Sequence, residues 1–267
     1  MTTIAFLGAG NIAQAIMGGM IENGMAARHI WARDPSPSCM DWVNDQGINA
    51  ASNNDEAIAA AEVVMLCIKP NVLIDVLSAI GEDVSSKLFI SVAAGITTAM
   101  MTPHLPIGTP IIRCMPNTPV QIQTGMTALF PTQTVTDEQR AVAQDILTAV
   151  GQAVWVDSEA DLDSVTAVSG SGPAYFFLMM ESMISAAEAL GLQHEFAKQL
   201  VLQTALGSAK MAHQSPDDPA TLREKVTSPS GTTQAAIEHF QAQGFEKIVD
   251  GAVSAAQRRS VELANEN

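Results

Sequence analysis

Basic residues and cysteines are scarce in this chain of 267 residues. There are 13 Lys and Arg against 28 Asp and Glu, which gives a formal net charge of −15. A globally acidic protein repels phosphate backbones and anionic lipid headgroups, so we expect neither nucleic acid nor a membrane surface as its partner. A local basic pocket for a small anion is still compatible with this charge.

The three cysteines, Cys39, Cys67 and Cys114, are odd in number and widely spaced. This fits neither a disulfide framework nor a zinc signature. The five histidines are also scattered, without a metal-binding spacing. We therefore expect no metal site.

Long uncharged apolar runs are missing as well. The most apolar stretch, residues 174–192, contains Glu181 and Glu188, and the amino terminus has no basic segment ahead of an apolar run. A transmembrane helix needs about 20 nearly uncharged residues. The sequence therefore predicts a cytoplasmic protein in which residues 174–192 form a buried helix.

Proline is distributed unevenly: nine of the 13 prolines lie at or before Pro131, and residues 174–215 contain none. Proline inside a helix costs about 3 kcal/mol, so the proline-free stretch permits long helices. The first half instead alternates short apolar strands with helices, which indicates a parallel, doubly wound sheet. We predict an α/β protein with a sheet domain at residues 1–157 and an all-helical domain at residues 158–267.

A glycine-rich loop follows the first predicted strand, residues 4–7. It reads Gly8-Ala9-Gly10-Asn11-Ile12-Ala13 and leads into a predicted helix over residues 11–23. In this G-x-G-x-x-A pattern the first glycine permits a tight turn, the second admits a pyrophosphate, and the alanine lets helix and strand pack closely. The helix N-terminus offers free N–H groups to the phosphates. The context predicts dinucleotide binding.

Cofactor choice is read at the end of the second strand, in Ala32-Arg33-Asp34-Pro35-Ser36. An acidic residue there holds the ribose 2′-OH of NAD, whereas arginine favours the 2′-phosphate of NADP. Arg33 directly follows the strand and Ser36 can add a hydrogen bond to a phosphate, so we predict NADPH, with NADH as the alternative. Asp34 either reads the ribose or only starts the next turn.

Two further loops leave the carboxyl ends of predicted strands, where ligands bind in such sheets. They are residues 67–71, which include Lys69, and residues 91–95. Small residues in these loops permit close approach of a ribose or nicotinamide. Lys69 is either a cation that faces the ligand or a surface lysine.

Two segments of the second half stand out. Residues 227–233, Thr-Ser-Pro-Ser-Gly-Thr-Thr, place more hydroxyl groups at a helix start than capping needs. They serve either as a cap or as an anion nest for a carboxylate. Residues 169–175, Ser-Gly-Ser-Gly-Pro-Ala-Tyr, interrupt two predicted helices. They form either a simple turn or a flexible backbone that lines a substrate cleft.

Together these segments resemble the 1-pyrroline-5-carboxylate reductase family, the last enzymes of proline biosynthesis. In the first half the resemblance rests on residues 8–11, 68–70, 93–95 and Arg113-Cys114-Met115-Pro116-Asn117-Thr118-Pro119. In the second half it rests on residues 169–175 and 227–233. It implies a Rossmann-type domain followed by a helical domain that forms an intertwined homodimer, and dimers that can assemble into a homodecamer.

The resemblance also implies roles for individual residues. Ser228, Gly231, Thr232 and Thr233 would hold the carboxylate and ring nitrogen of 1-pyrroline-5-carboxylate. Thr233 is the candidate catalytic residue, which either relays a proton or orients an imine that is already protonated. The residues implied to line the NAD(P) site are Leu7, Gly8, Ala9, Gly10, Asn11, Ile12, Arg33, Ser36, Asn54, Cys67, Ile68, Lys69, Pro70, Ala93, Ala94 and Gly95.

The implied reaction transfers a hydride from NAD(P)H to the imine carbon and gives L-proline. One departure is visible, since the family usually has Gly-Gly where this chain has Ser230-Gly231. If that position needs a positive φ, serine is strained there.

Two alternatives remain beside this assignment. β-Hydroxyacid dehydrogenases share this domain plan, and a helix of their second domain has a Lys-x-x-x-Asn pattern. Here the residue four positions after Lys198 is Leu202, and the one four positions after Lys210 is Gln214, so the pattern is absent. A non-catalytic NADPH-binding protein would not need the 227–233 loop.

Overall fold

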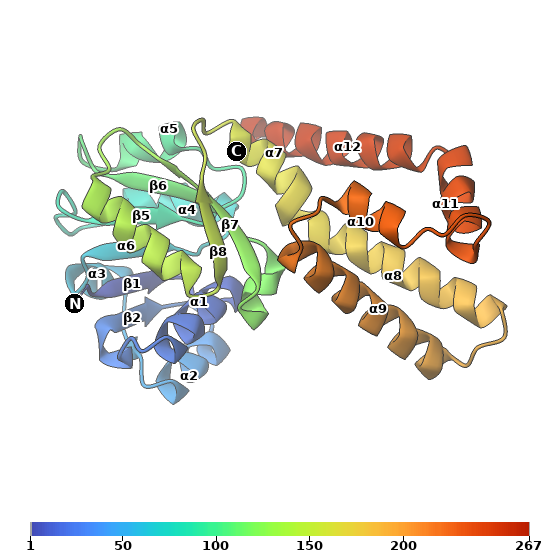
Figure 1. The fold of residues 1–267 in the computed structure, drawn as a ribbon. Coiled ribbons are helices and arrows are strands. Elements are labelled where there is room, and N and C mark those ends of the chain that lie inside the picture. The colour runs from blue at the N-terminus through green and yellow to red at the C-terminus, as the bar shows by residue number, and fades with distance from the viewer. Residues whose placement is uncertain (1, 267) are drawn as a thin grey trace. The chain divides into compact units, whose positions relative to one another are not determined.

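The computed structural model describes residues 2–266. One eight-stranded sheet has the strand order β3-β2-β1-β4-β5-β6-β7-β8 (Figure 1). Its strands are β1 (Ile4–Leu7), β2 (Ile30–Arg33), β3 (Asn49–Ala50), β4 (Val63–Leu66), β5 (Leu88–Ser91), β6 (Ile111–Met115), β7 (Gly125–Pro131) and β8 (Gly151–Trp155). The helices of this part are α1 (Asn11–Glu22), α2 (Pro37–Asp45), α3 (Asn54–Ala59), α4 (Pro70–Ser78), α5 (Thr98–Met101), α6 (Asp137–Thr148) and α7 (Asp161–Val165).

Helices cover both faces of the sheet, which explains the continuous apolar sequence of its central strands. Every residue of β1, β4 and β5 is buried. On one face the core includes Ile16 of α1 and Leu147 of α6, and on the other it includes Leu73 of α4. This confirms the predicted doubly wound α/β architecture.

The direction of β7 departs from the predicted alternation. It pairs antiparallel with β6, whereas the other strand pairs are parallel. Only residues 116–124 join the two strands, as a 3-10 turn at Thr118–Ile122. Two neighbouring parallel strands are joined by a crossover of a dozen or more residues, which brings the chain back to the end of the sheet where the first strand began. The connection between β6 and β7 is too short for such a crossover. The predicted parallel arrangement therefore holds from β1 to β6, whereas β7 and β8 run in the opposite direction.

The remaining elements are helical, as predicted. They are α8 (Gly172–Ala189), α9 (His194–Gln214), α10 (Pro219–Lys225), α11 (Thr232–Ala242) and α12 (Phe245–Glu266). By its internal contacts the described chain divides into one compact unit of residues 2–171 and 256–266 and a second of residues 172–255. The C-terminal end of α12 joins the first unit, where the Ser260 hydroxyl donates to Asp163 at 2.7 Å. The domain division at residues 157 and 158 stays a prediction.

The helix predicted to be buried, α8, is exposed in the single chain. Phe176 and Phe177 are 69% and 63% exposed, and Leu190, just beyond the helix, is 85% exposed. Of the helix's residues only Gly172 is buried. Its apolar side chains spread around the helix, so its partners within the chain cannot cover them all. No helix among residues 2–266 is both long and apolar enough to cross a membrane.

Candidate cofactor and substrate site

The candidate cofactor residues lie at the carboxyl edge of the sheet. Strands β2, β1, β4 and β5 are neighbours and run parallel, so the loops after them leave from the same edge. The strand order reverses between β1 and β4, which is where ligands bind in open sheets of this kind. Backbone hydrogen bonds hold the loops together: Gly8 donates to Arg33 and Cys67 donates to Leu7, both at 2.8 Å.

The two glycines of the first loop have different functions. Gly8 has a φ of +95°, and a Cβ there would collide with the carbonyl oxygen of Cys67. Gly10 has open space around the position of a Cβ and precedes α1 without a side-chain cap. The first N–H groups of α1 are therefore free to meet an anion that approaches Gly10.

Asp34 is bound to the backbone of the glycine loop. Its Oδ2 accepts the N–H of Ala9 and its Oδ1 accepts the N–H of Ser36, both at 2.8 Å. The carboxylate thus starts the turn after β2, which is one of the two roles that the sequence left open. Arg33 lies beside it and donates to the Asp34 carbonyl oxygen at 2.8 Å.

The other cofactor candidates lie close to this edge. Asn54 is half-buried at the start of α3, and Lys69 is exposed immediately before α4. Cys67 follows β4, and burial raises the pKa of its thiol to about 12. The thiol is therefore neutral at physiological pH and can pack against a ligand but not act as a nucleophile.

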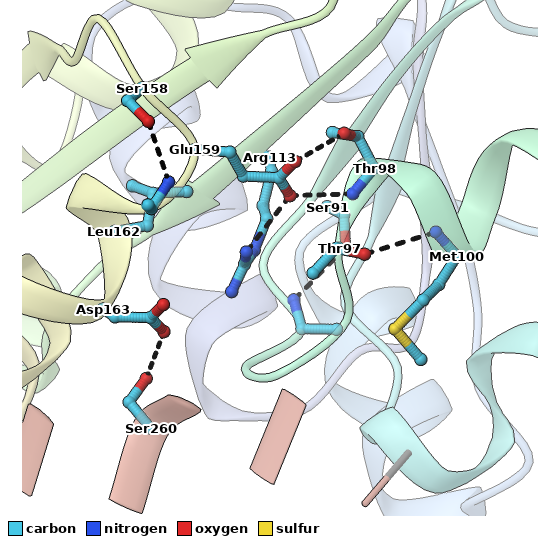
Figure 2. Close-up of polar contacts among 12 residues, drawn as sticks. Ser91, Thr97, Thr98, Met100, Arg113, Ser158, Glu159, Leu162, Asp163 and Ser260 are labelled. Carbon is cyan, nitrogen blue, oxygen red and sulfur yellow. Dashed lines mark hydrogen bonds and ion pairs between the residues drawn. The ribbon is translucent and has the colours of Figure 1, made fainter. Parts of the chain in front are cut away.

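A polar cluster that the sequence did not reveal lies beside the 93–95 loop (Figure 2). The Glu159 carboxylate accepts the N–H of Thr98 at 2.8 Å and the hydroxyl of Thr98 at 2.6 Å. It also pairs with the Arg113 guanidinium at 3.1 Å. Arg113 is the one charged residue of the apolar strand β6, and a buried charge needs a partner. The sequence could therefore have indicated that Arg113 forms an ion pair. Nothing in the sequence pointed to Glu159 as that partner.

The segment 169–175 is mostly helical and is not a simple turn. Residues Thr166–Gly170 form a π-helix between α7 and α8, and the N–H of Ser171 donates to the Thr166 carbonyl at 2.8 Å. The Asn117 side chain donates to the backbone oxygen of Ser169 at 3.3 Å. Since Asn117 follows β6, the π-helix lies at the same edge of the sheet as the cofactor loops. Such π-helical insertions are frequent at functional sites.

The 227–233 loop belongs to the second unit. Gly231 caps α11 through its backbone, and no hydroxyl side chain within the described chain caps that helix. The Ser230 N–H donates to the Gln234 side chain at 2.6 Å. Ser230 has a φ of +60°. This is the positive φ at which serine is strained, as the sequence comparison with the usual Gly-Gly anticipated. With no role as side-chain caps, the hydroxyls of Thr232 and Thr233 are available for another function.

Comparison with known proteins adds evidence along the whole chain. Residues 159–263 match the family model described as pyrroline-5-carboxylate reductase dimerisation. Residues 3–95 match the model described as NADP oxidoreductase coenzyme F420-dependent. The chain is 46% identical over 265 residues to a pyrroline-5-carboxylate reductase of Pseudomonas aeruginosa, covering 98% of this chain and 97% of the relative. It is 42% identical to the Haemophilus influenzae enzyme, with 97% of each chain covered.

Solved structures agree with these sequence relatives. A pyrroline-5-carboxylate reductase from Coxiella burnetii superposes with a TM-score of 0.94 at 38% identity, over 98% of each chain. The Plasmodium falciparum pyrroline carboxylate reductase, solved with NADP bound, gives 0.88 at 29% identity, also over 98% of each chain. These identities and coverages extend over both units of the fold. The chain belongs to the pyrroline-5-carboxylate reductase family.

Proposed function

We propose that this protein reduces 1-pyrroline-5-carboxylate to L-proline with NADPH as the electron donor. The observation that carries the proposal is the combination of a phosphate-binding loop at the switch point of the sheet with family membership over nearly the whole chain. This combination favours the reductase over a β-hydroxyacid dehydrogenase or a non-catalytic NADPH-binding protein. The protein is an oxidoreductase of the NAD(P)H-dependent class.

The carboxyl edge of the sheet fits a dinucleotide. The open space at Gly10 and the uncapped start of α1 suit a pyrophosphate. Arg33 and Ser36 are proposed to bind the adenosine 2′-phosphate, because both lie in the turn after β2 and offer hydrogen-bond donors, and Arg33 adds a positive charge. The other residues proposed to line this site are Leu7, Gly8, Ala9, Asn11, Ile12, Asn54, Cys67, Ile68, Lys69, Pro70, Ala93, Ala94 and Gly95.

The loop before α11 is proposed to bind the substrate. The positive end of α11 and the hydroxyl groups of Ser228 and Thr232 suit the substrate carboxylate, and the backbone of Gly231 can approach it closely. Thr233 is proposed to hydrogen-bond the ring nitrogen. When bound, the cofactor supplies the hydride for the imine carbon, and the protein positions and polarises the imine.

A direct assay tests this function. Purified protein is mixed with NADPH or NADH and 1-pyrroline-5-carboxylate, the loss of reduced cofactor is followed by absorbance, and proline is identified as the product. We expect rapid oxidation with NADPH and slower oxidation with NADH. Binding of NADPH without turnover would contradict the assignment and favour the non-catalytic alternative.

We further propose that the second unit forms a homodimer. It contains an apolar pocket of about 680 Å³, lined by residues that include Met179, Met183, Leu200, Ile237 and Phe240. The unit also exposes large apolar side chains, as described for α8, and such surfaces mark interaction sites. The matching family model is one of dimerisation. Sedimentation equilibrium should show a dimer or a multiple of it. The homodecamer and the cytoplasmic location stay predictions.

A further inference from the structure

We propose that Glu159 is a positioning residue which, through Thr98, holds the loop of residues 92–97 in the shape that receives the nicotinamide end of the cofactor. The proposal rests on the function proposed above, because it takes residues 93–95 as part of the cofactor site. Figure 2 shows the Glu159 carboxylate between Arg113 and Thr98, with a contact to each of them.

The loop is anchored at its first end by the sheet. Ser91 is fully buried at the end of β5, and its hydroxyl accepts the N–H of Ala93 at 3.3 Å. Its carbonyl oxygen accepts the thiol of Cys114 at 3.3 Å. This end of the loop therefore cannot move without disturbing two adjacent strands.

The second end is anchored by the Glu159 carboxylate and by Thr97, whose hydroxyl caps α5 by accepting the N–H of Met100 at 3.3 Å. Glu159 accepts both the N–H and the hydroxyl of Thr98, at 2.8 and 2.6 Å. Hydrogen bonds to an ionised carboxylate are among the strongest in proteins, and two of them on one residue fix its orientation. Thr98 itself is only 8% exposed, so solvent competes little for these bonds.

Arg113 fixes the carboxylate in turn. Arg113 is 5% exposed and pairs with Ser91 of the neighbouring strand β5. Its guanidinium lies 3.1 Å from the Glu159 carboxylate. A buried guanidinium without a counter-charge is costly, so the ion pair holds the Glu159 side chain in place. Since Glu159 lies after β8 and also bonds Thr98, it connects the segment after β8 to the start of α5.

Between the two anchors, Ala93 and Ile96 are buried in the core of the sheet domain, at 3% and 1% exposure. Ala94 is exposed, and Gly95 has a φ of +74°. The small residues at this tip let a ligand approach the backbone closely, and the fixed flanks hold the tip in one shape. Fixing both ends before the cofactor arrives lowers the ordering cost of binding.

Three threonine variants test this inference. Thr98→Val removes the hydroxyl but keeps the shape, while Thr98→Ser keeps the hydroxyl. Thr102→Val is the matched control, because the Thr102 hydroxyl donates only to the Thr98 carbonyl at 2.7 Å and does not touch Glu159. For each variant, KM and kcat are measured with NADPH, Kd for NADPH is measured by fluorescence titration, and Tm is recorded.

We expect Thr98→Val to raise the KM and Kd for NADPH by about three- to tenfold, with kcat at saturating NADPH changed much less. Thr98→Ser and Thr102→Val should keep the wild-type KM. Equal KM for Thr98→Val and wild type, or equal increases in Thr98→Val and Thr102→Val, would overturn the positioning role alone. Wild-type protein that does not bind NADPH would overturn the proposed function, and this inference with it.

Discussion

The carboxylate of Asp34 lies 2.8 Å from the backbone nitrogen of Ala9 and ties the turn after β2 to the glycine loop. Each oxygen of this carboxylate accepts one backbone N–H, the second from Ser36. We propose that the neighbouring Arg33, which is half-buried, and Ser36 recognise the adenosine 2′-phosphate. This relationship has a measurable consequence for cofactor preference.

Arg33→Ala should lower kcat/KM with NADPH about ten- to a hundredfold, because a hydrogen bond to a charged group contributes roughly 1.5–3 kcal/mol. The NADH value should change much less, since NADH has no 2′-phosphate. Arg28→Ala is the control: it removes the same charge from an exposed position before β2, at the opposite edge of the sheet. Equal losses with both cofactors would mean that Arg33 does not bind the 2′-phosphate.

Thr233→Ala should lower the rate of proline formation about ten- to a hundredfold if its hydroxyl holds the imine nitrogen at the transition state. The KM for NADPH should stay unchanged, because Thr233 is not among the residues proposed to bind the cofactor. Thr227→Ala is a suitable control, since the Thr227 hydroxyl donates to the Arg223 carbonyl at 2.6 Å. A loss below about threefold in the Thr233 variant would remove this residue from the mechanism.

Ser230→Gly should stabilise the protein by about 0.5–1 kcal/mol, because a non-glycine residue at positive φ is strained and glycine is not. The bond from the residue 230 N–H to Gln234 is kept, since it involves only the backbone at that position. Ser228→Gly is the control, because Ser228 is not among the described residues with positive φ. Denaturant unfolding should show a gain for the first variant only; similar changes in both would show that φ is not the cause.

Cys67 and Cys114 should react slowly with an alkylating reagent in the folded protein, whereas Cys39 should react fast. Cys114 is buried, and Cys67 is partly exposed like Cys39 but has a raised thiol pKa. Burial raises the pKa of the Cys67 thiol to about 12, and it also raises the pKa of the Cys114 thiol. Cys39→Ser should therefore abolish the fast phase of labelling by a thiol reagent. A second fast phase that persists in this variant would contradict the raised pKa of the other two thiols.

The same thiols predict a loss of stability at alkaline pH. Their folded-state pKa values lie above the ordinary value of 9.0, so the unfolded chain releases protons first as the pH rises. The free energy of unfolding should fall from about pH 9 upward. A Cys67→Ala, Cys114→Ala double variant should show a shallower decline, and an equally steep one would assign the effect to other groups.

The sequence alone determined the features that follow from local rules. The strand, glycine turn and helix of residues 4–23 were predictable from two glycines. Because glycine has no Cβ, Gly8 can form the tight turn and Gly10 can let a pyrophosphate approach the backbone. The helix from Asp137 was predictable too, because its Thr136 cap and acidic first turn act within a few residues. The 227–233 loop could be recognised by its surplus of hydroxyl groups, although its function could not.

Only the tertiary structure decided the features that depend on distant pairings. The partner of Asp34 is Ala9, 25 residues away, and the partner of Arg113 is Glu159, 46 residues away. The antiparallel direction of β7 likewise follows from the length of its connection to β6, and the exposure of α8 follows from which surfaces the chain itself can cover. The type of a residue determines which groups its side chain can hydrogen-bond and whether burial is favourable. The path of the chain determines which of the possible partners lies close enough to make the contact.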